Sequence, residues 1–198
     1  RIMNMIAPYI PFLVGGSADV ASTTNAYLEN MGDITKDYFY GRNIRFGVRE
    51  HAMGAIANGL ALSNFRTFVS TFLCFSDYLK PAIRMSALMK LPVVYIFTHD
   101  SILVGQDGPT HQPIEHMSLL RSIPNVTVYR PCDAKEVIGA WNTLLNENDH
   151  PSVLILSRTE VPQLGDTKIE SVQNGAYIIR KEEKLDAWLI VILIFLGW

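Results

Sequence analysis

The feature that most constrains the fold is the alternation of short apolar, β-branched runs with segments whose apolar residues recur at helical spacing. Residues 93–97 are apolar throughout, which is typical of a strand covered on both faces. We expect strands at residues 12–14, 44–46, 66–70, 93–97, 126–129 and 152–156, the first ending at Gly15 and Gly16. We expect helices at residues 50–61, 78–89, 114–121 and 134–145. Strands separated by helices predict an α/β fold with a parallel, doubly wound sheet flanked by helices on both faces.

The composition suits a single α/β domain and excludes several classes of partner. The 198 residues are 48% hydrophobic and 18% charged, so a large buried core is expected. A net charge of -2 gives no basic field, so we expect neither nucleic acid nor a membrane surface as a partner. Cys74 and Cys132 are the only cysteines, too few for a disulfide framework, and they suit a reducing cytoplasm.

The C-terminal end reads differently from the rest of the chain. Residues 165–173 are polar, and residues 187–198 are almost wholly apolar. The apolar stretch is shorter than the roughly 20 residues of a membrane-spanning helix. Its β-branched content predicts a buried parallel strand of a following domain. We therefore expect one domain at residues 1–164, then a linker and a fragment of a second domain at residues 165–198.

Glu50 is the first candidate for chemistry. It starts a predicted helix after a predicted strand, where exposed N–H groups and the helix dipole favour a carboxylate. Small residues follow at Ala52, Gly54 and Ala55, which allows a ligand or another backbone to approach closely. A helix-start glutamate in a tightly packed helix is the alternative.

An aromatic group and a polar loop follow in the sequence. Phe72, Phe75 and Tyr78 would line one side of a helix or tight turn and form a slot for a flat heterocycle, although a core stripe has the same pattern. The loop at residues 98–113 carries two histidines and two aspartates between glycines and prolines. No third ligand at regular spacing indicates a metal site, so recognition of a hydroxylated substrate with proton transfer by histidine fits better than metal binding or a solvated loop.

Arg158 ends the last predicted strand of the first domain. A guanidinium at the carboxyl edge of a parallel sheet is well placed to bind a phosphate or carboxylate through its fork. A surface ion pair explains the same residue equally well.

Taken together, these motifs resemble the transketolase family. The matching stretches, in the family's order, are GGSAD at 15–19, GVREHAMGA at 47–55, TFLCFSDY at 71–78, THDS at 98–101, DGPTHQP at 107–113, RP at 130–131 and SR at 157–158. The resemblance covers roughly residues 12 to 164 and implies the pyrimidine-binding domain of a thiamine diphosphate enzyme, followed by the start of the C-terminal domain.

The resemblance implies a role for each candidate residue. Glu50 would hydrogen-bond the aminopyrimidine ring and activate thiamine diphosphate. The remaining cofactor-binding residues would be Phe72, Phe75, Tyr78 and Asp19, and the substrate-binding residues would be His99, Asp107, His111, Arg158 and Thr23. His99 and His111 would also be catalytic, and no residue of this chain would bind the metal.

The resemblance further implies transfer of a two-carbon ketol unit between sugar phosphates in the pentose phosphate pathway. The diphosphate and its magnesium or calcium ion would be bound by a separate N-terminal domain, which belongs to the partner subunit of a homodimer. Its Gly-Asp-Gly motif is not in this sequence, so the isolated chain is expected to be inactive. Two alternatives remain: a non-catalytic folding and dimerisation module, and an enzyme like 1-deoxyxylulose-5-phosphate synthase.

Overall fold

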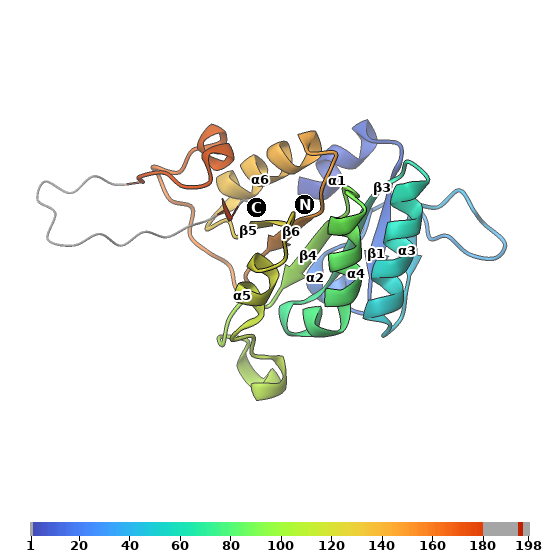
Figure 1. Ribbon diagram of the computed structural model, residues 1–198, viewed down its shortest axis with the longest axis horizontal. Helices are drawn as coiled ribbons and strands as arrows, with labels where there is room; N and C mark the ends of the chain where they lie inside the picture. Colours follow the sequence, from blue (N-terminus) through green and yellow to red (C-terminus); the bar gives the residue numbers. More distant parts are fainter. Residues whose placement is uncertain (1, 180–193, 196–198) are drawn as a thin grey trace, which may run out of the picture.

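The computed structural model describes residues 2–179 and 194–195, which form a sheet covered on both faces (Figure 1). The strands are β1 Leu13–Ser17, β2 Asn43–Arg45, β3 Arg66–Phe72, β4 Val94–Thr98, β5 Thr127–Tyr129, β6 Ser152–Ile155 and β7 Ile194–Phe195. Their order is β2-β1-β3-β4-β6-β5-β7, and the pairings among β1 to β6 are all parallel. The predicted α/β fold with a parallel sheet is confirmed.

The expectation of a parallel strand in the C-terminal tail is wrong for its described part. β7 pairs antiparallel with β5, at the edge of the same sheet. β-branched composition favours a strand but carries no information about its direction, because direction depends on how the chain returns to the sheet. Residues 180–193 and 196–198 of the predicted linker and tail lie outside the described residues.

Helices cover the two faces of the sheet. The longer ones are α3 Glu50–Leu62, α4 Ser76–Leu88 and α6 Ala134–Asn146. The shorter ones are α1 Ile2–Ile6, α2 Ala21–Thr24, α5 His116–Arg121, and the 3-10 turns η1 Ala7–Tyr9, η2 Leu73–Phe75, η3 Gly105–Asp107, η4 Pro109–His111 and η5 Ile169–Asn174. The four predicted helices are confirmed within a few residues. α1 and α2 were not predicted, because one turn of helix is too short to show a period.

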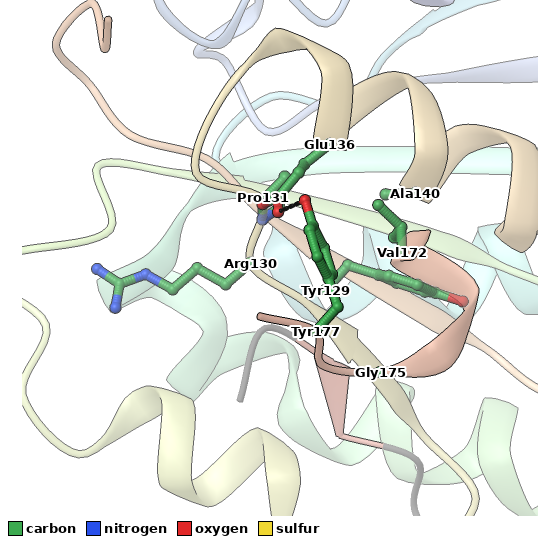
Figure 2. Close-up of a pocket in the computed structure, with 8 residues that line it drawn as sticks. All are labelled: Tyr129, Arg130, Pro131, Glu136, Ala140, Val172, Gly175 and Tyr177. Atoms are coloured by element: carbon green, nitrogen blue, oxygen red, sulfur yellow. Dashed lines mark hydrogen bonds between the residues drawn. The ribbon is translucent and has the colours of Figure 1, made fainter. Parts of the chain in front are cut away.

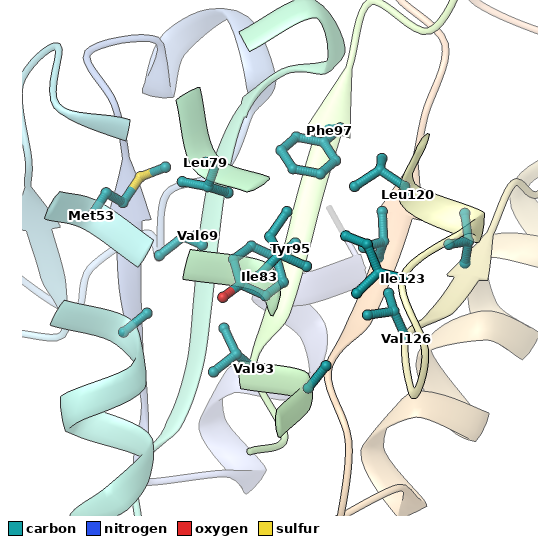
Figure 3. Close-up of a cluster of buried hydrophobic side chains, with 14 of the residues drawn as sticks. Met53, Val69, Leu79, Ile83, Val93, Tyr95, Phe97, Leu120, Ile123 and Val126 are labelled. Atoms are coloured by element: carbon teal, nitrogen blue, oxygen red, sulfur yellow. The ribbon is translucent and has the colours of Figure 1, made fainter. Parts of the chain in front are cut away.

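Two cores lie on opposite sides of the sheet. α3, α4 and α5 bury Met53, Leu79, Ile83 and Leu120 against one face, as Figure 3 shows. On the other face, Trp141 of α6 packs in a second cluster. Alternate residues of β4 enter alternate clusters, as expected of a central strand buried on both sides.

β1 extends beyond the predicted end at Gly15 and Gly16. A Cβ atom at Gly15 would lie 1.9 Å from the carbonyl oxygen of Phe68, and one at Gly16 would lie 1.9 Å from that of Ile44. The glycines therefore continue the strand and allow close contact with the strands on either side. Glycine usually weakens a strand, and here it permits a close backbone approach instead.

The strand order fixes where a ligand can bind. From β1 the chain crosses to β2 on one side, and β3 then lies on the other side of β1. In open parallel sheets the binding crevice lies at such a switch point, beyond the carboxyl ends of the strands. None of the helices in the described part of the chain is both long and apolar enough to cross a membrane.

Candidate active site

A cleft of about 490 Å³ lies at this switch point. It is lined by Ala18, Asp19, Val20, Val48, Glu50, Phe75 and Tyr78. Glu50 is the first residue of α3 and is 8% exposed. Its carboxylate makes no hydrogen bond or ion pair with any residue that the structure describes. A mostly buried carboxylate at a helix N-terminus, left without a protein partner and facing a cleft, is suited to bind a hydrogen-bonding ligand.

The three aromatic residues come together although they lie on three different elements. Phe72 ends β3, Phe75 lies in η2 and Tyr78 lies in the first turn of α4. The Phe72 and Phe75 rings are stacked with centroids 5.8 Å apart, and the Phe75 and Tyr78 rings are 6.3 Å apart. The tight turn between β3 and α4 therefore gathers the rings. Phe72 is buried and does not line the cleft, whereas Phe75 and Tyr78 line it.

The two predicted histidines lie against this aromatic group. His99 is 2% exposed, and its ring stacks on Phe72 with centroids 3.8 Å apart. His111 meets Phe75 edge-on at 5.2 Å. The backbone of His99 has φ +59°, a conformation that a non-glycine residue rarely adopts. Backbone strain of this kind concentrates at functional sites.

The electrostatic surroundings keep the His99 imidazole neutral. Burial lowers the pKa of His99, the positive charge of Arg158 lowers it further, and the negative charge of Asp107 opposes the shift. Its Nδ1 lies 2.9 Å from Oγ1 of Thr98. A neutral imidazole can both donate and accept a hydrogen bond, so His99 is suited to bind a hydroxyl or carbonyl group.

Asp107 and Arg158 form an ion pair whose charges act on His99. Arg158 Nε lies 4.0 Å from Oδ2 of Asp107, and both side chains are partly exposed.

The sequence did not predict the ion pair at Arg130, whose Nη2 donates to Oδ2 of Asp100 at 2.8 Å. Asp100 directly follows His99, so this pair fixes the exit of β4. The sequence shows both residues but not their contact, because they are thirty positions apart.

Asp19 lines the cleft, whereas Thr23 does not. Asp19 has φ +62° and lies between the cleft and a second cavity of about 210 Å³. The second cavity also includes Ser22, Tyr27 and Arg45, none of which carries a recognisable sequence signal. Thr23 is exposed on α2 and lines neither cavity. Phe72, His99, Asp107, His111 and Arg158 also line neither cavity, but ring contacts and an ion pair join them beside the cleft, whereas no such contact joins Thr23 to the group.

A third cavity has no room for a ligand. Figure 2 shows it between β5, α6 and η5, lined by residues that include Glu136, Val172 and Tyr177. Its volume is about 10 Å³, no more than a single water needs. The Tyr177 hydroxyl donates to Oε1 of Glu136 at 2.6 Å, and the Glu136 Oε2 accepts from the N–H of Cys132 at 2.8 Å. The Tyr177 bond holds the segment after β6 on α6, and the Cys132 bond holds the loop between β5 and α6.

The family model for the transketolase pyrimidine-binding domain matches residues 1–163. The chain belongs to this family. The transketolase of Bacillus subtilis is 49% identical over 196 residues, which are 96% of this chain and 29% of that protein. The transketolase of Geobacillus stearothermophilus is 50% identical over 183 residues, 90% of this chain and 27% of that protein.

Solved transketolases have the same fold. The Pichia stipitis enzyme in complex with sedoheptulose 7-phosphate matches with a TM-score of 0.90 and 39% identity, over 93% of this chain and 28% of that one. The Leishmania mexicana enzyme matches with a TM-score of 0.90 and 43% identity, over 92% of this chain and 28% of that one. The chain thus spans less than a third of the length of these transketolases, and the resemblance expected from the motifs is confirmed.

Proposed function

We propose that this chain is the pyrimidine-binding part of a transketolase and supplies half of each active site. In this proposal the whole enzyme transfers a two-carbon ketol unit between sugar phosphates, in the pentose phosphate pathway. The observation that carries the proposal is the Glu50 carboxylate, which opens onto the cleft beside Phe75 and Tyr78 without a protein partner. Family membership supports the same role.

The cleft fits the aminopyrimidine ring of thiamine diphosphate. Phe75 and Tyr78 offer aromatic faces to a flat ring, and the Phe72 ring stacks on that of Phe75. Glu50 would hydrogen-bond a ring nitrogen and keep the ring in its active tautomer, while Asp19 would close the opposite side of the cleft. When bound, the cofactor supplies the nucleophilic carbon that carries the two-carbon unit.

The polar side chains beyond the aromatic group suit a sugar phosphate. In the proposal, His99 in its neutral form binds the carbonyl and hydroxyl groups and transfers protons together with His111, and Asp107 binds a further hydroxyl. Arg158 would bind the phosphate through its guanidinium, with Thr23 nearer the phosphate end. Two solved Pichia stipitis transketolases were in complex with sedoheptulose 7-phosphate and xylulose 5-phosphate, which supports substrates of this class.

We further propose that a second domain completes the site. The diphosphate and its magnesium or calcium ion would be bound by an N-terminal diphosphate-binding domain of the partner subunit in a homodimer. A split-gene transketolase, 26% identical over 84% of this chain with a TM-score of 0.64, forms an inactive β4 tetramer, which supports inactivity of one part alone. Residues 1–164 would be the pyrimidine-binding domain, residues 165–198 would lead into the C-terminal domain, and the free thiols of Cys74 and Cys132 suit a cytoplasmic location.

A folding and dimerisation module is the second candidate. It is favoured by the outer face of α3, where Ala52, Ala55 and Ile56 are exposed and small or apolar. Such a face suits packing against a second copy. One chain can have both roles. Turnover by the longer enzyme that carries this chain would show a catalytic role, and absence of turnover would leave the purely structural role.

Two measurements test the proposal. The longer enzyme that carries this chain should convert xylulose 5-phosphate and ribose 5-phosphate, and turnover that depends on pyruvate would instead indicate a 1-deoxyxylulose-5-phosphate synthase. The isolated chain should show no micromolar binding of thiamine diphosphate with magnesium in calorimetric titration. Micromolar binding by the isolated chain would contradict a site divided between two domains.

A further inference from the structure

One ion pair joins the ends of two strands that are not neighbours in the sheet. Arg130 directly follows β5, and its Nη2 donates at 2.8 Å to Oδ2 of Asp100, two residues after β4. β6 lies between β4 and β5 in the strand order, so the ion pair spans the carboxyl end of β6. Figure 2 shows the Arg130 side chain extending away from the small cavity beside α6. The pair therefore lies across the edge of the sheet from which His99 and Arg158 emerge.

The turn after β4 depends on side chains. His99 has φ +59°, and backbone in such a conformation persists only where its surroundings hold it. Outside the helices and strands of the described residues, no backbone hydrogen bond includes His99 or Asp100. The His99 ring stacks on Phe72, and its Nδ1 contacts Oγ1 of Thr98. The remaining restraint is the bond from Arg130 to the Asp100 carboxylate.

The geometry of the ion pair makes it a strong restraint. Its length is that of a charge-assisted hydrogen bond. Ion pairs between two exposed side chains contribute little, but the Asp100 side chain is only 13% exposed, against 42% for Arg130. A mostly buried carboxylate that loses its partner keeps the cost of desolvation, so Asp100 would have to move toward water. The guanidinium therefore fixes Asp100 and, with it, the preceding residue His99.

We propose that Arg130 is a positioning residue that acts on His99 through Asp100. The ion pair holds the turn after β4 so that the His99 imidazole stays on Phe72, where it meets the substrate. This inference rests on the proposed function, in which His99 binds the carbonyl and hydroxyl groups of a sugar phosphate. Neither Arg130 nor Asp100 lines the cleft beside Glu50, so the affinity for the cofactor should not depend on the pair.

Proton NMR of the 198-residue chain tests the positioning without any turnover. The ring current of Phe72 displaces the His99 ring-proton signals from those of a solvated histidine, because the two rings are stacked at 3.8 Å. We expect Arg130→Gln and Asp100→Asn each to shift these signals toward the solvated position, and Arg130→Lys to retain most of the displacement. The spectrum of His99→Gln identifies the signals, and circular dichroism checks that each variant is folded.

Arg45→Gln is the matched control for the NMR measurement. It breaks another arginine–aspartate pair at the end of a strand of the same sheet, with Arg45 Nε 3.0 Å from Oδ2 of Asp33. Arg45→Gln should leave the His99 signals unchanged. Signals of His99 that do not move in Arg130→Gln and Asp100→Asn would overturn the proposal, whatever the activity of the enzyme. An equal shift in Arg45→Gln would also overturn it.

Kinetics of the longer enzyme that carries this chain test the consequence for ketol transfer. Arg130→Gln and Asp100→Asn should each lower kcat by up to about 10²-fold, the cost of displacing a positioned group by about 1 Å. The concentration of thiamine diphosphate that gives half-maximal activity should stay the same. The double variant should lose no more kcat than either single variant, because each substitution breaks the same pair. Arg130→Lys should recover part of the loss.

The kinetic outcomes separate positioning from substrate binding. If Arg130→Gln raises the KM for the sugar phosphate while Asp100→Asn leaves kcat and KM unchanged, Arg130 binds the substrate directly and the proposal is overturned. An unchanged kcat in both variants also overturns it. A longer enzyme without ketol transfer before any substitution would contradict the proposed function instead, and the NMR result would still decide whether Arg130 positions His99.

Discussion

Two buried tyrosines allow the same chemical change to be compared in two electrostatic settings. Tyr95 is 0% exposed on β4, and Tyr129 is 1% exposed on β5. Burial raises the pKa of both hydroxyl groups, so both remain protonated at neutral pH. We predict that Tyr129→Phe lowers the free energy of unfolding more than Tyr95→Phe does.

The Tyr95 hydroxyl belongs to a neutral network. It lies 2.5 Å from Oγ of Ser86 on α4 and 3.3 Å from Oδ1 of Asn58 on α3. After Tyr95→Phe, Ser86 still contacts Asn58 at 2.5 Å and the Ala82 carbonyl oxygen at 3.1 Å, so no buried polar group loses its last partner. The loss should be that of one neutral hydrogen bond, about 0.5–1.5 kcal/mol.

The Tyr129 hydroxyl instead donates to a carboxylate. It lies 2.8 Å from Oε1 of Glu147, whose side chain is 17% exposed. Hydrogen bonds to charged groups contribute about 1.5–3 kcal/mol, and Tyr129→Phe removes one from a mostly buried charge. His150 and Ser152 still contact the other oxygen, Oε2, which limits the loss to that range.

Urea unfolding followed by circular dichroism measures both variants on the 198-residue chain. The slope of the free energy against urea should be unchanged, because neither substitution alters the surface that unfolding exposes. Equal losses, or a larger loss for Tyr95→Phe, would refute the idea that the charge of the acceptor decides the cost.

Two further predictions concern pH and packing. The hydrogen bond to Glu147 raises the pKa of His150 against the opposing effect of burial, so its stabilisation is complete below about pH 6.5 and is lost as pH rises through the folded pKa. The stability difference between wild type and His150→Gln should therefore shrink from pH 6 to pH 8 in urea titrations, and a constant difference would contradict this. Gly16→Ala should cost at least about 1–3 kcal/mol, the usual penalty of overpacking, because its Cβ would meet the Ile44 carbonyl oxygen at 1.9 Å. Thermal melting measures this loss, and an unchanged melting temperature would show that β1 and β2 can separate at no cost.

Most of the sheet could be predicted from the sequence because its strands are buried on both faces. Such strands are apolar throughout, as in β4, and the intervening helices bury one regular face. The continuation of strand β1 through Gly15 and Gly16 could not be predicted, because it depends on how closely β2 and β3 approach β1. The direction of β7 depends on a long-range pairing with β5, which no local pattern encodes.

The candidate site was predictable in its residues but not in its geometry. The spacing of Phe72, Phe75 and Tyr78 suggested one side of a helix or a tight turn, and a strand end, a 3-10 turn and the start of a helix supply the three rings. The stacking of His99 on Phe72 joins the ends of β3 and β4, which are neighbours only in the folded sheet. Contacts of this kind follow from strand order, so they emerge only once the topology is known.

The most direct test of the central claim is the activity of Glu50→Gln in a working enzyme. Residues 1–163 of this chain can replace the matching segment of Bacillus subtilis transketolase, which is 49% identical to the chain. Glu29→Gln is the control, because Glu29 is exposed and lines neither cavity. We predict that Glu50→Gln lowers kcat for ketol transfer by about 10²-fold or more, as for loss of a proton-transfer group, while Glu29→Gln leaves it unchanged. A Glu50→Gln enzyme with the kcat of the unsubstituted chimera would contradict the account.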